Sequence, residues 1–312
     1  MAIKQFFLEQ KERRIISENC REIIHNLAVT IGERPLTKYE SLLEAQHFIT
    51  LRFQAMGASI TTQEYMVQSR TVSNIITELP GTRKPERVIL IGAHYDTVEG
   101  TPGADDNATA VAGLLELYRL LSKHQLLRTI RFVAFTLEEP PFFSSDAMGS
   151  MRYAKECERC KAPIDFMICL EMLGFGGRNA KQNYPIADMK NHYPAVGNYL
   201  AVVSLPSSSE FAYLWRNTWN KYAGKRKIYD MIGPSSVPGI GLSDHYSFNR
   251  CGFKSIMLTD TAFFRNTNYH TENDTIETLN FRFLSYNIWY AYLTLLDIAN
   301  REVLPNEKTY CR

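Results

Sequence analysis

The chain has 312 residues, of which 45% are hydrophobic and 22% are charged, an ordinary balance for a globular protein with a sizeable core. The formal net charge is only +2 and the basic residues are spread along the chain, so the sequence carries no electrostatic footprint for nucleic acid. No run approaches the roughly 18 consecutive apolar residues of a membrane-spanning helix, so we expect no membrane partner either.

The N-terminus and the cysteines bear on location. The opening sequence MAIKQFFLEQKERR lacks the apolar core of about 7–15 residues that a secretory signal needs. The six cysteines are sparse and irregularly spaced, which favours free thiols in a reducing compartment. Cys157 and Cys160 form a CxxC, but no second pair lies at the spacing of a zinc site. We therefore expect a cytoplasmic protein.

Helical and extended patterns alternate along the chain. In order, we expect helices over 6–31 and 37–56 (ending at Gly57), strands in ASITTQEYMV, SNIITEL and RVILIGAHY, a helix over 108–124, the strand TIRFVAFTL, a helix over 145–156 and the strand IDFMICLEM. A polar stretch from Gly174 to Gly197 is expected as a long loop, which in compact domains is usually functional. The strand NYLAVVSL, a serine-capped helix in SSSEFAYLWRNTWNKYA, the last strand FKSIMLTD and a helix over 280–302 follow.

This alternation predicts an α/β fold with a mainly parallel, mixed central sheet between layers of helices. The sequence has no internal repeat, low-complexity tract or interdomain linker. We therefore expect a single domain over 1–312, with 1–31 as a helical extension packed on it.

Histidines and acids cluster where the predicted strands end, which is the edge that binds ligands in open α/β sheets. His94 and Asp96 form an HxD, in which Asp96 is a natural partner for the second ring nitrogen of a metal-binding His94. A surface histidine beside a turn is the alternative. Asp105 and Asp106 precede a helix, where a carboxylate either caps the helix or bridges two cations.

Three further acids are candidates for cation binding. Glu138 and Glu139 directly follow an apolar strand, and solvation of both in a loop is the alternative. Glu171 is flanked by apolar residues on both sides. Buried carboxylates without a positive partner are costly. Zinc favours histidine nitrogen and carboxylate oxygen, and two zinc ions can share one carboxylate and one hydroxide. His270, in a polar segment, would complete such a site, although an ordinary loop histidine is the alternative.

Six segments resemble, in order and spacing, those of the co-catalytic two-zinc aminopeptidases, whose wider relatives include glutamate carboxypeptidase and glutaminyl cyclase. These segments are IGAHYDTV, PGADDNATA, FVAFTLEE, ICLEMLG, GLSDHYSF and YHTENDT, and the resemblance runs from about Ile31 to Leu279. It implies the zinc-dependent exopeptidase (phosphorylase/hydrolase-like) fold. It also implies an aminopeptidase that hydrolyses the N-terminal residue of a peptide or aminoacyl substrate through a hydroxide bridging two Zn²⁺ ions, with other divalent metals possible.

The resemblance implies a role for each matching residue. The implied metal ligands are His94, Asp106 (bridging), Glu139, Glu171 and His270. Asp106 is preferred to Asp105 because the family aspartate precedes a segment such as NAT. The implied catalytic residues are the general base Glu138, the orienting acid Asp96 and the hydrogen-bond donor Tyr269. Asp244 and His245 are expected to line the pocket wall, and Arg265 is a candidate for binding a substrate carboxylate.

The sequence also departs from the family pattern. Glu171 stands where many aminopeptidases have Asp, Ala110 replaces a usual Gly, and EEPPFF lacks a Gly-rich continuation. A glutaminyl cyclase-like transferase with one zinc, a carboxypeptidase that uses Arg265 and a non-catalytic binding module remain alternatives. The intact His94 and Asp96 favour two metals. GLSDH lacks the G-x-S-x-G turn of a serine hydrolase, and the oligomeric state is not indicated.

Overall fold

The computed structural model describes residues 2–224 and 227–310 and is built on one eight-stranded sheet. The strands are β1 (Thr61–Val67), β2 (Arg70–Leu79), β3 (Gly81–His94), β4 (Leu126–Phe135), β5 (Ile164–Glu171), β6 (Leu200–Ser204), β7 (Ile228–Ile232) and β8 (Ser255–Thr259). Their order in the sheet is β1-β2-β4-β3-β5-β8-β6-β7. Strands β4, β3, β5 and β8 are mutually parallel, whereas β1, β2 and β6 join antiparallel neighbours. The predicted mixed, mainly parallel sheet is therefore confirmed.

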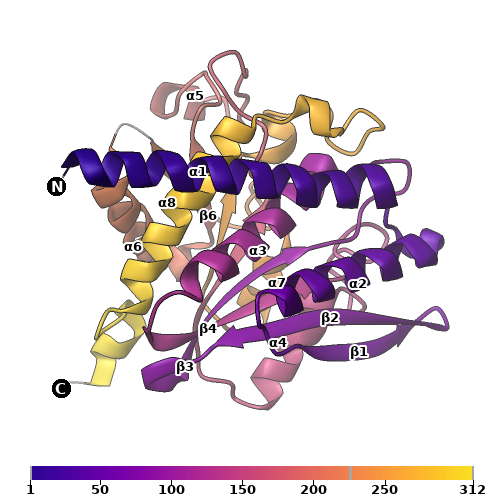
Figure 1. The fold of residues 1–312 in the computed structure, drawn as a ribbon, viewed down its shortest axis with the longest axis horizontal. Coiled ribbons are helices and arrows are strands. Elements are labelled where there is room, and N and C mark those ends of the chain that lie inside the picture. The colour runs from indigo at the N-terminus through magenta and orange to yellow at the C-terminus, as the bar shows by residue number, and fades with distance from the viewer. Residues whose placement is uncertain (1, 225–226, 311–312) are drawn as a thin grey trace.

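Helices cover both faces of this sheet (Figure 1). They are α1 (Ala2–His25), α2 (Tyr39–Ala55), α3 (Ala110–Leu121), α4 (Gly149–Arg159), α5 (Met189–His192), α6 (Ser209–Tyr222), α7 (Asp244–Arg250) and α8 (Phe281–Ala299). Helices α1, α2, α3, α6 and α8 contribute to the apolar core on one face, and α4 and α7 to the core on the other. Both faces of the central strands are thus buried, which explains their nearly continuous apolar sequences.

Strand β3 shows how the sequence divides between the two cores. Ile89 and Ile91 pack into the larger core, and Leu90 packs into the smaller one. Successive side chains of a strand point to opposite faces, so an uninterrupted apolar run supplies both cores at once. The same alternation holds in β4, where Phe132 and Val133 belong to different cores.

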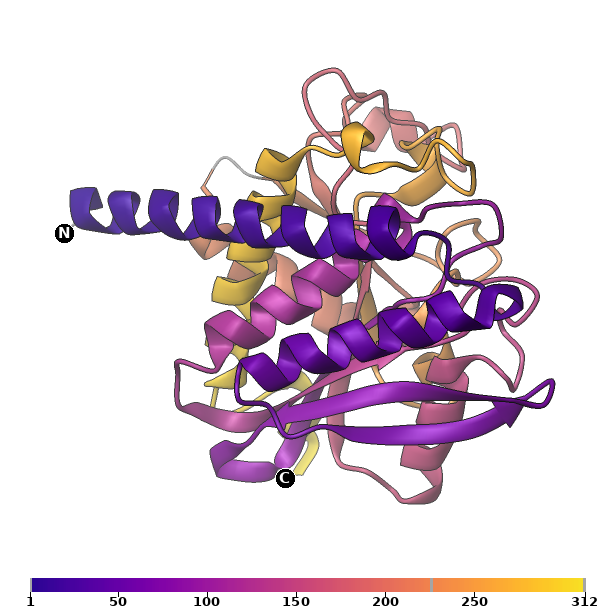
Figure 2. The same ribbon diagram turned by 45° about the vertical axis from the view of Figure 1, so that its right-hand side comes forward.

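The N-terminal helix α1 packs across α3 and α8 (Figures 1 and 2). Its buried apolar side chains include Ile16, Cys20, Ile23 and Ile24. No helix among the described residues is long and apolar enough to cross a membrane. The cysteines among the described residues are free, and Cys311 lies outside them. Both ends of the expected domain 1–312 also lie outside the described residues.

Three local expectations differ from the structure. Strand β7 and helix α7 were not predicted, because each is short and β7 is an edge strand that pairs only with β6. The long loop over 174–197 contains the short α5 and a bridge between Lys181 and Val196. The predicted serine cap of α6 is wrong: the Ser208 hydroxyl accepts hydrogen bonds from Asn249 and from the backbone of Ser255, so it fixes the start of β8 instead.

Candidate metal centre and active site

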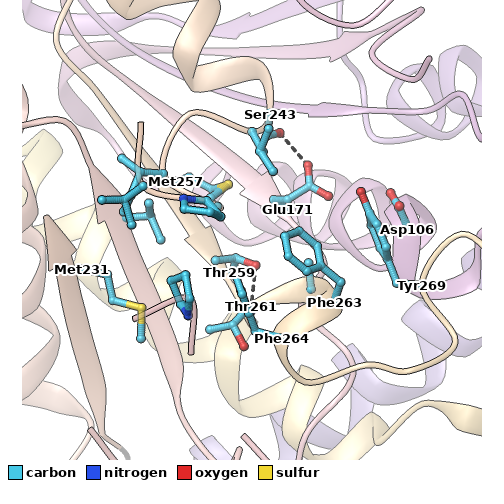
Figure 3. Close-up of a pocket in the computed structure, with 18 of the residues that line it drawn as sticks. Asp106, Glu171, Met231, Ser243, Met257, Thr259, Thr261, Phe263, Phe264 and Tyr269 are labelled. Atoms are coloured by element: carbon cyan, nitrogen blue, oxygen red, sulfur yellow. Dashed lines mark hydrogen bonds between the residues drawn. The ribbon is translucent and has the colours of Figure 1, made fainter. Parts of the chain in front are cut away.

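The predicted acids and histidines meet at one edge of the sheet because β4, β3 and β5 are parallel neighbours. His94 is the last residue of β3 and Glu171 the last of β5, while Glu138 and Glu139 follow the end of β4. Figure 3 shows Glu171, Asp106 and Tyr269 side by side at one end of a cavity. The strand order therefore assembles the site from segments far apart in the sequence.

Asp106 reaches this edge from the loop between β3 and α3. Gly103 adopts a left-handed conformation (φ 64°), and a Cβ there would come within 2.3 Å of the Thr97 side chain, so the turn requires glycine. The carboxylate of Asp274 accepts the backbone N–H groups of Asp105 and Asp106, each at 3.0 Å. These contacts fix the loop with Asp106 facing the ends of the strands.

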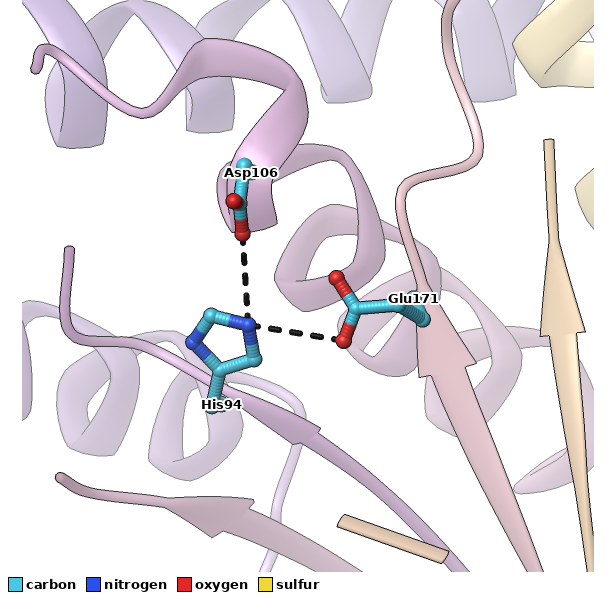
Figure 4. Close-up of side chains that lie close together, drawn as sticks. All are labelled: His94, Asp106 and Glu171. Atoms are coloured by element: carbon cyan, nitrogen blue, oxygen red, sulfur yellow. Dashed lines mark ion pairs between the residues drawn. The ribbon is translucent and has the colours of Figure 1, made fainter. Parts of the chain in front are cut away.

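The two carboxylate oxygens of Asp106 face the two histidines. Its Oδ1 lies 3.3 Å from His94 Nε2, and the same nitrogen lies 3.5 Å from Glu171 Oε2 (Figure 4). Its Oδ2 lies 3.2 Å from His270 Nε2, and that nitrogen lies 3.1 Å from Glu139 Oε2. Three candidate ligand sets have their ligand atoms within 4.8 Å of one another, and two of them share Asp106. The third combines His94 with Glu138 and Glu139.

The chemistry of this donor set fits divalent cations. Among the described residues, no Lys or Arg forms an ion pair with these acids, and their only ion pairs are with the two histidines. Asp106 Oδ1, Glu139 Oε1 and His270 Nε2 are buried without a hydrogen-bond partner. Buried polar atoms are normally paired, so these unpaired nitrogen and oxygen atoms suit metal ligation.

The site's pKa values report the same crowding of acids. Burial lowers the pKa of His94, but Glu171 and Glu138 outweigh burial and raise it well above its ordinary value. Burial and the neighbouring Asp106 raise the pKa of Glu139 to about 8, and burial likewise raises the pKa of Glu138 well above its usual range. Carboxyl groups that hold their protons so strongly need a positive partner to ionise near neutral pH.

Asp96 lies beside His94 and also organises the two glutamates. Its Oδ1 is 3.5 Å from His94 Nδ1. Its two oxygens accept the backbone N–H groups of Glu138 and Glu139, each at 3.0 Å. Asp96 therefore fixes the loop after β4 relative to the end of β3, a contact that the sequence did not indicate.

Tyr269 and Asp105 have separate environments. The Tyr269 ring stacks on the His270 ring with centroids 3.7 Å apart, and it lines the cavity. Burial and the nearby Asp106 raise the pKa of Tyr269, so its hydroxyl keeps a proton to donate. Asp105 instead accepts hydrogen bonds from Thr109, Gly174 and Asn266. The structure thus places Asp106, and not Asp105, between the histidines.

Ser243 is an additional residue of the site. Its hydroxyl donates to Glu171 Oε2 at 2.5 Å (Figure 3). The same oxygen lies 3.1 Å from Cys169 Sγ. Its backbone φ of 137° lies in the region that favours glycine. Ser243 falls inside the GLSDHYSF segment, but its contact with Glu171 depends on the packing of α7 beside β5.

The cavity extends from the acids into an apolar region and has a volume of about 220 Å³. Met231 on β7 and Met257 on β8 lie at the far end in Figure 3, with Phe263 and Phe264 between them and the acids. The polar groups thus occupy one end of a largely apolar cavity, which is the usual character of a ligand site.

The expected substrate-binding residues lie outside this cavity lining. Asp244 and His245 are fully buried in the first turn of α7, and His245 bonds to the carbonyl of Ile240. The Arg265 guanidinium is also buried, because it donates to Gln182 Oε1 and to the carbonyl of Phe175 and stacks over Tyr199. The structure therefore gives Arg265 a place in holding the loop over 174–197, and not a position to receive a substrate carboxylate.

Arg34 is the main residue that sequence reasoning missed. It is fully buried, and its guanidinium donates to five backbone carbonyls, those of Leu27, Gly32, Tyr95, Pro102 and Gly103. These bonds tie the end of the N-terminal helical segment to both sides of the loop that connects His94 to Asp106. Nothing in its sequence context, IGERP, distinguishes it from a surface arginine.

Known proteins resemble this chain in sequence and in fold. The model of Peptidase family M28 matches residues 74–291. The Escherichia coli protein YfbL, itself described as uncharacterized, is 35% identical over 284 residues, covering 88% of this chain and 86% of that protein. Leucine aminopeptidase 1 of Emericella nidulans is 27% identical over 239 residues, covering 71% of this chain but 53% of its own length. The chain thus spans about half of that aminopeptidase.

A solved structure supports the fold. BSAP, a zinc aminopeptidase from Bacillus subtilis, superposes with a TM-score of 0.73 at 15% identity, covering 93% of this chain and 97% of that one. At this identity the likeness concerns the arrangement of helices and strands. The α/β fold predicted from the sequence is therefore confirmed.

Proposed function

The chain belongs to peptidase family M28, and from this premise we propose that it is a zinc-dependent aminopeptidase that removes the N-terminal residue of peptides. The observation that carries the proposal is the placement of Asp106 between two histidine-containing ligand sets. The zinc aminopeptidase from Bacillus subtilis and the leucine aminopeptidase of Emericella nidulans support this choice of metal and reaction.

We assign two cation positions to the site. His94, Asp106 and Glu171 would hold one ion, and Asp106, Glu139 and His270 the other. When bound, the cations would supply Lewis acidity, which polarises a water molecule and brings its pKa toward about 7. The charges support the assignment, since three carboxylates otherwise lie together with only two imidazoles beside them.

The remaining residues handle the proton and the substrate. Glu138 lines the cavity with its Oε2 3.9 Å from His94 Nε2, close to the ligand groups yet outside both assigned sets. It accepts the proton of the attacking water and returns it to the leaving amine, as a general base and acid. Tyr269 donates its hydroxyl proton in a hydrogen bond to the oxygen that becomes negative at the scissile carbonyl.

The cavity indicates the part of the substrate that it receives. A free α-amino group is attracted to the acidic end, where the carboxylates lack Lys or Arg partners among the described residues. The side chain of the N-terminal residue then extends toward Met231 and Met257 in the apolar end. We therefore expect a preference for bulky apolar N-terminal residues.

A panel of aminoacyl fluorogenic substrates tests this function. We expect hydrolysis of leucyl and phenylalanyl substrates, loss of activity with a chelator, recovery with zinc, and no hydrolysis of the N-acetylated counterparts. Release of C-terminal residues from N-blocked dipeptides would instead identify a carboxypeptidase. Cyclisation of N-terminal glutamine without peptide hydrolysis would identify a glutaminyl cyclase-like transferase.

A further inference from the structure

A second pocket lies at the start of helix α8, apart from the acids and histidines of the metal centre. It has a volume of about 760 Å³ and is lined by residues of the loop over 174–197 and by the beginnings of β7 and α8. We call it the α8 pocket. The lining residues used below are Arg178, Asn198, Lys227, Asn280, Arg282 and Phe283. Its volume falls within the range of about 300–1,000 Å³ that is usual for small-molecule sites.

The α8 pocket is positively charged. Arg178, Lys227 and Arg282 line it, and no Asp or Glu is among its described lining residues. None of these three side chains forms an ion pair with another described residue, whereas nearby Arg216 pairs with Asp230 and Arg301 with Asp297. Cations that gather in one concave site without counter-charges concentrate anions there.

The neutral groups of the pocket also favour an anion. Asn280 caps α8, because its Oδ1 accepts the backbone N–H of Phe283 at 3.0 Å. The pocket therefore contains the first turn of a 19-residue helix, whose N-terminal end carries partial positive charge. The side-chain amide of Asn198 adds a further hydrogen-bond donor. Charge and hydrogen-bond donors thus converge on the same space.

The wall of the α8 pocket also separates it from the catalytic cavity. The loop closes on itself through hydrogen bonds between Gly177 and Gly197 and between Gln182 and Ala195. Gly177 and Arg178 line the α8 pocket, whereas Gln182 lines the catalytic cavity. A ligand of the α8 pocket would therefore occupy a site distinct from that of the peptide.

We propose that the α8 pocket binds a small anionic molecule that carries at least two phosphate or carboxylate charges. Three cations that form no ion pair with a described residue require more than one negative charge for neutralisation. Phosphate and carboxylate oxygens match the donors of Arg178 and Arg282, since guanidinium groups bind both in a bidentate manner.

Isothermal titration of the zinc-loaded protein with inorganic pyrophosphate, and separately with tricarballylate, tests this site at fixed ionic strength. Both probes can also contact the metal centre. Comparison of a pocket variant with a control variant therefore shows whether binding occurs in the α8 pocket. The pocket variant is R178Q/K227Q/R282Q. The control is K123Q/R159Q/K161Q, which replaces exposed basic residues outside the pocket. Each triple substitution changes the formal net charge equally, from +2 to −1.

We expect at least one probe to bind the wild type and the control with equal affinity, and to bind the pocket variant at least tenfold more weakly. Preference for pyrophosphate or for tricarballylate would identify phosphate or carboxylate as the recognised group. Equal affinity for all three proteins would place binding elsewhere and overturn the proposal. Absence of binding by both probes would overturn it as well. The test measures binding and not hydrolysis, so failure of this proposal can be distinguished from failure of the proposed function.

Discussion

The position of Asp106 explains how its acidic neighbours can be buried. Its two oxygens face His94 and His270 separately, so that Glu171 and Glu139 lie in different ligand sets. Two cations held in this way would share Asp106 as a ligand. Their positive charge would offset the repulsion among the carboxylates. The proposed catalysis depends on this arrangement, because it leaves Glu138 free to transfer protons.

The individual residues differ in how far the sequence could predict them. The acids could be predicted because a carboxylate at the end of an apolar strand is costly without a cation. Arg34 and Asp274 could not, because they act by hydrogen bonding to backbone groups of segments that only the tertiary fold brings near. The burial of Arg265 over Tyr199 could not be predicted, because it depends on the path of the loop over 174–197.

Substitution of Glu138 tests its assigned role. We expect Glu138→Gln to lower kcat about 10²–10⁴-fold, because the amide cannot accept the water proton. Zinc content should not change, since Glu138 belongs to neither assigned ligand set. Glu44→Gln, the same change at an exposed position of α2, is the control and should retain full activity. Full peptidase activity in Glu138→Gln would show that another group transfers the proton.

At the scale of elements, the central strands were predictable and the peripheral ones were not. Strands β3, β4 and β5 have long apolar sequences because both of their faces are buried. Strand β7 has five residues and contains Asp230, so its sequence does not stand out from a loop. Its omission mattered for function, because Met231 of β7 lines the apolar end of the cavity.

The apolar end can be filled to test substrate selection. We expect Met231→Trp to reduce the ratio of kcat/KM for leucyl over alanyl substrates about tenfold or more, because the larger side chain excludes the leucyl group. Met66→Trp, at a side chain that is 59% exposed, is the control. An unchanged ratio in Met231→Trp would mean that the N-terminal side chain binds elsewhere.

The loop after β3 depends on Arg34. We expect Arg34→Met to lower the free energy of unfolding by about 3 kcal/mol or more, because several buried carbonyls lose their donor at about 1–3 kcal/mol each. Zinc affinity should fall as well, since the loop connects His94 to Asp106. Arg14→Met, at a largely exposed position, should change stability by no more than about 0.5 kcal/mol. Denaturant unfolding and zinc competition would measure both effects. Wild-type stability and affinity in Arg34→Met would contradict this role.

At the scale of the whole molecule, polar interactions reinforce both ends of the sheet. The metal centre lies where β3, β4 and β5 end. Near their beginnings, the buried Arg128 bonds to Asp165 and Glu307 and so ties the C-terminal segment to the sheet. The network at Arg128 is neutralised by protein side chains, whereas in our proposal bound cations neutralise the acids of the metal centre. Removal of metal should therefore destabilise only the end of the sheet where β3, β4 and β5 end.

This dependence should vary with pH. Burial raises the folded-state pKa values of Glu139 and Asp274 to about 8, and both groups ionise near pH 4 when unfolded. A raised folded-state pKa gives stability at low pH that is lost as the pH rises toward 8. The Tm of the chelated protein should therefore fall between pH 6 and pH 8.

Zinc should counteract this loss. Metal binding requires ionised carboxylates and neutral histidines, so added zinc should raise Tm more at pH 8 than at pH 6. Thermal unfolding with chelator and with excess zinc at both pH values would measure the difference. A larger zinc-induced shift at pH 6, or none at either pH, would contradict the assignment.

Crystals of the zinc-loaded protein, measured with X-rays at the zinc absorption edge, test the central claim most directly. The account predicts two anomalous peaks about 3.5–4 Å apart. One peak should lie among His94, Asp106 and Glu171, and the other should lie between Asp106 and the pair Glu139 and His270. A map without peaks at these residues, or with a lysine or arginine side chain occupying the space between them, would contradict it.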